Sequence, residues 1–229
     1  MSAAIKKVTI TIDGPAGSGK STTARRVAAR LGYLYLDSGA LYRAVTLAAL
    51  RRQCDFHDSE ALAQIARTCR IELIPGPEGL LVLLEGEDVS TAIRTPEVAA
   101  AIGPVAANAG VRQALLAQQR RMGERGGIVA EGRDMGSVVF PRAEVKIYLV
   151  ASIEERARRR QKELAERGRY VELDDLVRSI RKRDEDDSQR DVSPLIKPED
   201  ALELDTTRLS IDEQVDWIVA IAKERGAVK

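Results

Sequence analysis

The segment GPAGSGKS at residues 14–21 constrains the fold of this chain more than any other feature. It matches G-x-x-x-x-G-K-[ST] in full, a pattern whose glycines let the backbone curl so that successive N–H groups point inward. A β-branched run at residues 8–12 precedes the segment, and a helical pattern at residues 20–31 follows it. The motif therefore predicts a strand, a phosphate-binding loop and a helix whose positive N-terminal end faces the phosphate. An ordinary glycine-rich turn is the weaker alternative.

Each residue of this loop has an expected part in binding ATP or GTP. Lys20 is expected to reach the β- and γ-phosphates as a point charge, and the Ser21 hydroxyl is expected to ligate Mg²⁺. The expected nucleotide-binding residues are Gly14, Pro15, Ala16, Gly17, Ser18, Gly19, Lys20, Ser21 and Thr22.

The charge balance and the rare residue types exclude several function classes. The chain has 36 Lys and Arg against 35 Asp and Glu, a net charge of +1 that gives no general attraction to nucleic acid or membranes. With one histidine, His57, and two distant cysteines, Cys54 and Cys69, neither a His/Cys zinc site nor a Ser-His triad is expected. No apolar run approaches the ~20 residues of a membrane span, and residues 1–13 carry no signal-peptide pattern. We therefore expect a cytoplasmic protein.

Segments with strand character alternate with helical segments along most of the 229 residues. Two short strands at 70–75 and 80–85, around a turn at 76–79, indicate a small antiparallel insert. The alternation elsewhere predicts an α/β fold, a parallel sheet covered by helices on both faces. Further strands are predicted at 33–36, 128–130, 145–150 and 201–204, and helices at 40–52, 96–121 (broken at Gly103–Pro104 and Gly110), 152–167, 172–189 and 211–225.

The class of phosphate-binding protein follows from the motifs that are missing. A GTPase needs an Asn-Lys-x-Asp base reader, but the only asparagine, Asn108, is followed by Ala109. Neither a DxxG turn nor an ABC-type ATPase signature occurs. A phosphotransferase remains, and it needs a second anion site close to the carboxyl ends of the strands.

Polar residues that follow two predicted strands are candidates for that second site. Ser38 is expected to cap the next helix, with Arg43 close to its start, an arrangement that suits a phosphate or carboxylate. Arg133 and Asp134 come soon after the strand at 128–130. Arg133 offers a bidentate fork for a phosphate, and Asp134 can accept from a sugar hydroxyl or a base amine. The alternatives are an ordinary cap with a surface arginine, and a surface turn.

The helix near residues 172–190 starts with an inward apolar stripe and then becomes charged on the same side. Arg183, Asp187 and Arg190 share that side at spacings i, i+4 and i+7. Because buried charges must be paired or bound to something, this face predicts either a polar wall around an anionic nucleotide or an ion-pair ladder. The arginine-rich helix before it, which contains Arg159, is either a solvated face or a mobile lid that brings arginine onto the phosphoryl group.

Five blocks of this sequence resemble bacterial cytidylate kinases, in the family's order and over about residues 8–210: DGPAGSGKST, LDSGALYRAV, LEGEDVSTAIRTPEV, EGRDMGSVVFP and KRD–DSQR–PL. The resemblance implies a nucleoside-monophosphate kinase fold in one domain, residues 1–229, with an acceptor-side insert near 65–104 and a lid near 152–168. It implies transfer of the γ-phosphoryl group from Mg²⁺-bound ATP to CMP or dCMP, giving CDP or dCDP. No nucleic-acid or membrane partner is expected, and with no symmetric apolar face a monomer is expected.

The same resemblance assigns roles to individual residues. Arg43 and Arg133 would hold the CMP phosphate, and Arg112 and Asp134 would face the cytosine. The implied acceptor-binding residues are Ser38, Arg43, Arg112, Arg133, Asp134, Arg183 and Asp187. The implied charge-stabilising, catalytic residues are Lys20, Arg133, Arg159, Arg183 and Arg190.

The sequence departs from the family pattern at a few positions. Gly103 stands where the family often has a serine that contacts the base, so preference for CMP over UMP is an open point. Ser137 stands where threonine is usual, and a second, acidic Mg²⁺ partner is either Asp37 or Glu131. A kinase for UMP or shikimate is the closest rival function. A nucleotide-switched binding module and an RNA-binding protein are the rivals from other classes.

Overall fold

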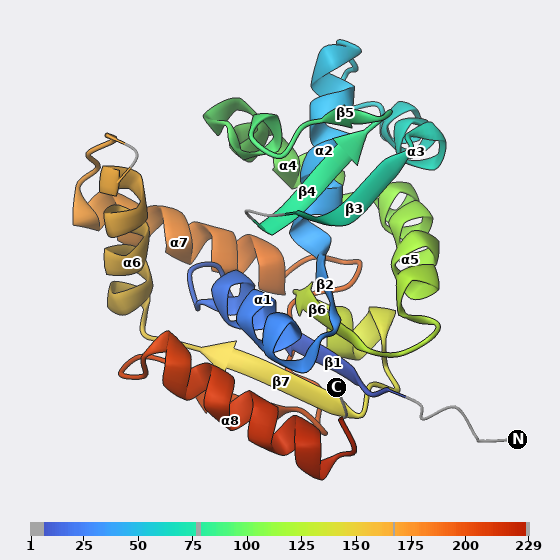
Figure 1. Cartoon of the computed structure of the whole chain (residues 1–229). Helices are drawn as coiled ribbons and strands as arrows, with labels where there is room; N and C mark the ends of the chain where they lie inside the picture. Colours follow the sequence, from blue (N-terminus) through green and yellow to red (C-terminus); the bar gives the residue numbers. More distant parts are fainter. Residues whose placement is uncertain (1–6, 77–78, 167, 228–229) are drawn as a thin grey trace, which may run out of the picture.

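A five-stranded parallel sheet lies at the centre of the computed structural model, which describes residues 7–76, 79–166 and 168–227 (Figure 1). Every neighbouring pair of strands is parallel, and Asp13 at the end of β1 lies opposite both Gly132 and Tyr148. The carboxyl ends of the strands therefore meet at one edge. In sheet order the strands are β2 (Leu34–Asp37), β6 (Ile128–Gly132), β1 (Thr9–Asp13), β7 (Val145–Val150) and β8 (Leu202–Asp205).

Helices cover both faces of this sheet, which confirms the predicted α/β fold. On one face α1 (Lys20–Leu31) and α8 (Ile211–Glu224) pack against apolar residues of β1 and β7. On the other face α5 (Ala109–Gly123) and the π-helical turn η2 (Met135–Val139) pack against β2 and β6. The strands β2 and β6 contribute side chains to both cores, whereas β1, β7 and β8 contribute to the core beneath α1 and α8.

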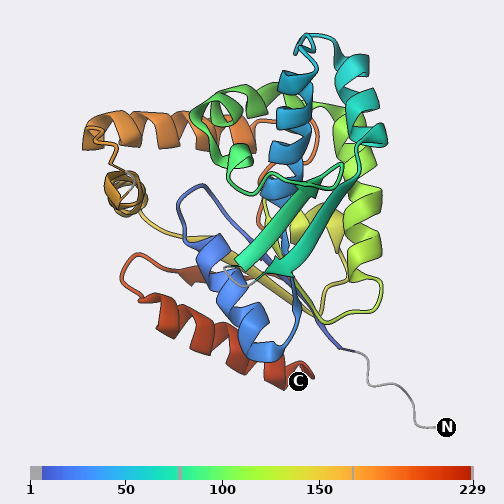
Figure 2. The same ribbon diagram turned by 45° about the horizontal axis from the view of Figure 1, so that its top comes forward.

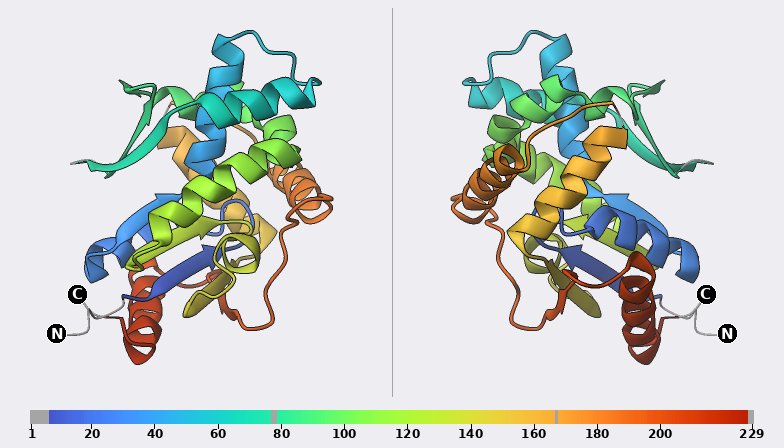
Figure 3. Two further views of the ribbon diagram at one scale, coloured as in Figure 1. Left: turned by 90° about the vertical axis from the view of Figure 1, so that its right-hand side faces the viewer. Right: turned by 90° about the vertical axis from the view of Figure 1, so that its left-hand side faces the viewer.

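A second, antiparallel sheet stands apart from the first (Figure 3). It consists of β3 (Ile71–Gly76), β4 (Gly79–Leu84) and the short β5 (Glu87–Asp88), and residues 77–78 of the predicted turn lie outside the described residues. The hairpin packs in one apolar core with the helices α2 (Ser38–Arg51), α3 (Ser59–Thr68), α4 (Pro96–Ala107) and α5, beside the 3₁₀ turn η1 (Ala92–Arg94).

Helices α6 (Ile153–Glu166) and α7 (Leu173–Ser188) form a separate unit that follows β7 (Figures 1 and 2). Its small core is made of Ala157, Leu164, Leu176 and Ile180, which confirms the apolar stripe expected on α7. Across the described part of the chain, no helix combines the length and the apolar character needed to cross a bilayer.

Two helix predictions were wrong. The helices do not break at Gly103–Pro104; the break lies at Asn108, two residues before the second break expected at Gly110, and the Asn108 side chain accepts from the N–H of Val111 and caps α5. Pro104 lies inside α4 because it lacks only one N–H donor near the end of that helix, and the core beneath compensates for this loss. The short helix α3 was missed: it is capped by Asp58 and has an apolar face of only a few residues.

Candidate active site

The predicted phosphate-binding loop joins β1 to α1. Gly14, Gly17 and Gly19 all have positive φ angles, of 147°, 77° and 96°, a backbone region that other residues rarely adopt. A Cβ atom on Gly14 would lie 2.1 Å from the carbonyl oxygen of Leu149, so the loop passes close to β7. Gly19 is the N-cap residue of α1, so the first N–H groups of that helix face the loop. The loop therefore has the backbone shape that a phosphate site requires.

Lys20 lies folded against this loop. Its side chain is largely buried, with Nζ donating to the carbonyl oxygen of Pro15 at 2.6 Å and to Ser18 Oγ at 3.4 Å. Burial, together with the positive charge of Arg133, lowers the pKa of Lys20 to about 7. Near neutral pH the Lys20 amine is therefore close to equal populations of its neutral and charged forms, and an anion in the loop would favour the charged form.

Ser21 faces a carboxylate from the neighbouring strand β6. Its Oγ donates to Glu131 Oε1 at 2.6 Å, and the Tyr35 hydroxyl lies 3.3 Å from the same oxygen. Burial, with the nearby charge of Asp37, raises the pKa of Glu131. β6 runs to Gly132, two residues further than predicted, so Glu131 belongs to the strand and is held in register beside β2.

The start of α2 differs from the prediction. Asp37, not Ser38, caps the helix: its Oδ1 accepts from the N–H of Ala40 at 2.9 Å, and its Oδ2 pairs with Arg43 at 2.9 Å. A carboxylate can take both the N–H and the guanidinium, so it outcompetes the serine hydroxyl for this role. Ser38 instead packs against Gly132, where a Cβ atom would lie 2.5 Å from Ser38 Oγ.

One acidic residue of α7 gathers two arginines. Asp187 Oδ2 accepts from Arg133 Nε at 2.7 Å, and Asp187 Oδ1 lies 3.6 Å from Arg190 Nη1. Although burial opposes it, Arg133 and Arg190 lower the pKa of Asp187. Arg190 follows the end of α7, so the three-residue helical face predicted for this stretch extends only to Asp187.

Arg183 remains accessible from the cleft rather than buried as the apolar stripe suggested. Among the described residues it makes no ion pair, and the surrounding protein together with Arg133 lowers its pKa to about 10. Unlike Arg183, the atoms Arg190 Nε, Arg190 Nη2 and Arg43 Nε are buried donors, and the described residues supply no hydrogen-bond partner for them. Native proteins leave few such donors unsatisfied, and an anion in the cleft could supply the missing partner.

Arg112 and Asp134 form an ion pair beneath the cleft, and both side chains are only 6 % exposed. Arg112 also donates to the carbonyl oxygen of Ala106 at 2.9 Å, and its guanidinium lies 5.3 Å from the centre of the Tyr42 ring. The pair joins α5 to the end of β6. The sequence placed Arg112 and Asp134 in one site. The structure brings them together, but their charged groups bind each other.

Two arginines of α6, Arg156 and Arg159, contact backbone carbonyl groups of the phosphate loop. Arg156 donates to the carbonyl oxygen of Ala16 at 3.1 Å and pairs with Asp184 of α7 at 2.7 Å. Arg159 donates to Thr206 O at 2.6 Å and to Glu155 Oε1 at 3.0 Å. This helix is therefore linked to both the loop and α7.

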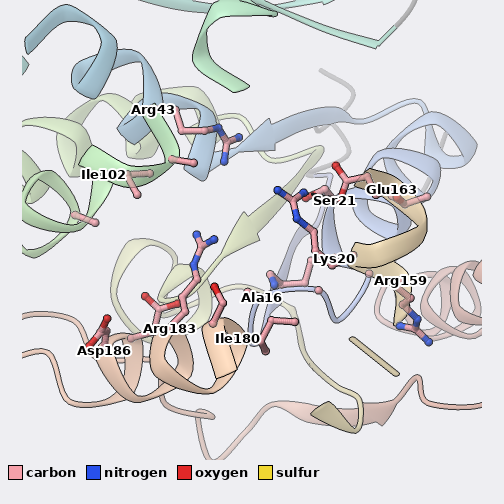
Figure 4. A pocket seen from close by; sticks show the side chains of 18 of the residues that line it. Ala16, Lys20, Ser21, Arg43, Ile102, Arg159, Glu163, Ile180, Arg183 and Asp186 are labelled. Carbon is pink, nitrogen blue, oxygen red and sulfur yellow. Dashed lines mark hydrogen bonds and ion pairs between the residues drawn. The ribbon is translucent and has the colours of Figure 1, made fainter. Parts of the chain in front are cut away.

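A single cleft of about 1910 Å³ connects these groups. Figure 4 shows Lys20 and Ser21 within it, with Arg43 and Arg183 to one side of Lys20 and Arg159 to the other. The predicted site residues that do not line the cleft are Gly14, Pro15, Ser18, Ser38, Arg112, Arg133 and Asp134. Of these, Arg112 and Arg133 contact the lining residues Ala106 and Asp187. The predicted site residues that line the cleft are Ala16, Gly17, Gly19, Lys20, Ser21, Thr22, Arg43, Arg159, Arg183, Asp187 and Arg190.

Comparison with known proteins agrees with this arrangement. The family model for cytidylate kinase matches residues 10–224. The chain belongs to the cytidylate kinase family. It is 50 % identical over 220 residues to the cytidylate kinase of Anoxybacillus flavithermus, covering 96 % of this chain and 98 % of that protein. It is 47 % identical over 221 residues to the Bacillus subtilis cytidylate kinase, covering 96 % and 99 %. As a member of this family the chain is a kinase.

A solved structure of an uncharacterized protein from Eubacterium ventriosum resembles the fold of this cytidylate kinase family member. Its TM-score is 0.51 at 11 % sequence identity, and the match covers 96 % of this chain and 99 % of that chain. At that identity the likeness concerns the fold alone.

Two residues of the site received no firm role from the sequence. Glu131 was only one of two candidates for the metal, and Asp13 received no role. A carboxylate near the carboxyl end of a buried parallel strand is costly to bury, and that cost was the available signal for both residues.

Proposed function

We propose that this cleft binds ATP at the phosphate loop and CMP or dCMP at the arginine-rich wall formed by α2, α7 and the residues after β6. The chain transfers the γ-phosphoryl group of ATP to CMP or dCMP, giving ADP and CDP or dCDP. One observation carries the proposal: a complete phosphate loop and a group of arginines with unsatisfied donors line the same cleft.

The donor nucleotide lies along residues 14–22 in this proposal. Lys20 leaves the carbonyl oxygen of Pro15 and turns toward the β- and γ-phosphates, where the added negative charge restores its proton. Arg159, on the opposite side of the loop from Arg183, adds positive charge near the donor. The helix end behind Gly19 supplies further N–H groups.

The acceptor monophosphate lies between Arg43, Arg133 and Arg183. Asp37 holds Arg43 and Asp187 holds Arg133, so both guanidinium groups are oriented before the acceptor arrives. The attacking phosphate oxygen is already an anion and needs no strong general base. The work of the site is to bring two polyanions together, which the arginines and Lys20 make possible by offsetting their repulsion.

The cytosine lies on the α4 side, above the Arg112–Asp134 pair, in this proposal. Ile93, Ile102 and Ala106 line the cleft there and offer an apolar surface to a base. Asp134 can accept from the base amine while it stays paired with Arg112. Ser38 lies beside Gly132 at the same end of the sheet and completes the acceptor side.

Mg²⁺ fits the oxygen ligands next to the loop. The Ser21 hydroxyl would hold it, with Glu131, already 2.6 Å from that hydroxyl, as the acidic partner directly or through water. The described residues contain no cluster of three metal-binding side chains, and magnesium at phosphoryl-transfer sites relies mainly on substrate phosphates and water. When bound, the ion would neutralise charge on the β- and γ-phosphates.

Residues 65–104 act as the acceptor-side insert and residues 152–168 as the lid of a single domain in this proposal. α6 and α7 share a small core of their own, and the Arg156 link to the phosphate loop gives them a point of closure. Closure would exclude water and suppress ATP hydrolysis. A cytoplasmic monomer with no nucleic-acid partner belongs to the same proposal.

Release of ADP from Mg-ATP tests the function directly. It is measured without acceptor and then with CMP, dCMP, UMP, AMP and shikimate. Fast release with CMP and dCMP only is the expected result. Comparable rates with UMP would indicate a pyrimidine-nucleotide kinase with relaxed base recognition. Slow release that no acceptor changes would overturn the kinase function in favour of a nucleotide-switched module.

A further inference from the structure

Asp13 has an unusual place in the fold. It is the last residue of β1, directly before the phosphate loop, and it is only 2 % exposed. It does not line the cleft, and both of its carboxylate oxygens are already bound by backbone N–H groups. Burial raises the pKa of Asp13 to about 7, which shows how unfavourable this environment is for a carboxylate.

Both oxygens of this carboxylate bind the backbone that follows the acceptor residues. Asp13 Oδ1 accepts from the N–H of Met135 at 2.9 Å, and Oδ2 accepts from the N–H of Gly136 at 2.7 Å. These two N–H groups open the π-helical turn η2, and the residues just before it are Arg133 and Asp134. Asp13 thus connects the start of the phosphate loop to the segment proposed to bind CMP.

The first N–H groups of a helical turn have no partner within the turn and usually bind the side chain at its N-cap. Asp134 occupies the N-cap position of η2, yet its side chain makes no capping hydrogen bond. It pairs with Arg112 instead. Asp13 supplies from another strand the cap that Asp134 would otherwise provide, which leaves the Asp134 carboxylate directed at Arg112.

The glycine at position 136 serves the same contact. A Cβ atom there would lie 2.9 Å from Thr11 Oγ1 and 3.3 Å from Asp13 Oδ2. Both distances are tighter than ordinary van der Waals contact, so any larger residue would push the turn away from β1. Glycine at position 136 therefore allows the start of η2 to lie close to Asp13 on β1.

We propose that Asp13 is a positioning residue for the acceptor nucleotide, holding Arg133 and Asp134 at a fixed place relative to the phosphate loop through the N–H groups of Met135 and Gly136. The inference rests on the proposed function, because it assigns those two residues to the acceptor. The residues proposed to contact the two nucleotides do not by themselves show this role. In this inference, β1, the strand that leads into the phosphate loop, also aligns the segment that binds the acceptor.

The test compares Asp13→Asn with Thr11→Val at about pH 8, above the pKa of Asp13, where an ionised carboxylate can accept both hydrogen bonds. Asparagine keeps the size but must present an N–H₂ group to one backbone N–H. We expect KM for CMP to rise at least ~10-fold, since small misplacements near reacting groups cost up to ~100-fold, while KM for ATP changes less than ~3-fold.

Thr11→Val is the matched control. Thr11 is buried on the same strand, its Oγ1 has no hydrogen-bond partner among the described residues, and valine preserves its shape. We expect it to leave both KM values unchanged. Gly136→Ala provides an independent variant, because it displaces the turn while Asp13 is intact, and the same selective rise in KM for CMP is expected.

The outcomes distinguish failure of the proposed function from failure of the positioning role of Asp13. If the wild-type chain does not phosphorylate CMP, the proposed function fails and the inference fails with it. If the wild type is active and Asp13→Asn raises both KM values equally, or only lowers the unfolding temperature, Asp13 has a structural role and the positioning inference is overturned. Should Asp13→Asn not fold, the KM values of Gly136→Ala decide in the same way.

Discussion

Arg133, just after the end of β6, forms an ion pair with Asp187 of helix α7: the guanidinium Nε lies 2.7 Å from the carboxylate Oδ2. The two side chains are 18 % and 14 % exposed. The pair joins the central sheet to the helical unit of α6 and α7 at the wall of the cleft. Partly desolvated pairs of this kind fix a geometry more reliably than exposed ones.

Asp187→Ala is expected to weaken CMP binding far more than ATP binding. Removal of the carboxylate leaves Arg133 without its partner and free to leave the position proposed for the acceptor phosphate. We expect KM for CMP to rise about 10- to 100-fold, in line with the loss of one charge-assisted contact. Steady-state kinetics with each nucleotide varied in turn measure this. Equal effects on both nucleotides would place Asp187 outside the acceptor site.

Lys20→Ala is expected to lower turnover at least ~100-fold, as is usual when a group that stabilises transferring charge is removed. Lys20 is the cation that lies within the phosphate loop itself. The rate of ADP formation at saturating CMP and ATP measures the effect. Lys20→Arg is the companion variant, since it keeps the charge but not the compact ammonium. A turnover close to the wild type in Lys20→Ala would refute the role of the loop in catalysis.

ATP binding is expected to take up a proton at Lys20. The pKa of about 7 in the free protein lies below the ordinary value of 10.5, so near pH 8 the free amine is mostly neutral. The phosphates favour the charged form and raise this pKa, and the proton comes from the buffer. Calorimetry in buffers of different ionisation enthalpy should give an uptake approaching one proton.

Lys20→Arg supplies the control for this proton uptake, because a guanidinium stays charged throughout this range. Uptake in the wild type and none in this variant is expected. Equal uptake in both proteins would contradict a lowered Lys20 pKa.

The lowered pKa of Lys20 also makes the stability of the free protein depend on pH. The contribution of Lys20 to the free energy of unfolding is fully present above pH 10.5 and decreases as the pH falls toward about 7.

Gly103→Ser is expected to increase the preference for CMP over UMP. Gly103 lines the cleft on the α4 side, and a Cβ atom there would meet nothing within 4 Å, so serine fits without strain. A hydroxyl that hydrogen-bonds one base and not the other changes the ratio of kcat/KM values by roughly 10-fold or more. Competition between CMP and UMP measures the ratio.

Gly103→Ala separates the hydroxyl from the helix effect of the same substitution. Both variants lie inside α4, where replacing glycine by alanine stabilises a helix by about 1 kcal/mol. Alanine should therefore raise the unfolding temperature without altering the CMP to UMP ratio. If alanine changes that ratio as much as serine does, the selectivity arises from the helix backbone rather than from the side chain.

Much of the fold could be predicted from local sequence. The phosphate loop depends on glycines at three positions and on the strand and helix beside them, all within residues 8–31. The parallel sheet followed from strand and helix periodicity. The short helix α3 escaped prediction because it has only 10 residues, too few for its periodicity to stand out. The cap at Asp37 escaped prediction because two adjacent polar residues, Asp37 and Ser38, can both fill this position.

The sequence by itself determined the type of each site residue, through the phosphate-loop motif, the polar residues that follow parallel strands and the charged side of the helix near residues 172–190. Only the tertiary structure decided which charges meet. Arg112 pairs with Asp134 across 22 positions and Arg133 with Asp187 across 54, while Asp13 reaches Met135 across 122. These pairings depend on how α5, η2 and α7 pack against the sheet. Hydrophobic burial sets that packing, and the burial is not directional, so no short stretch of sequence encodes the partners.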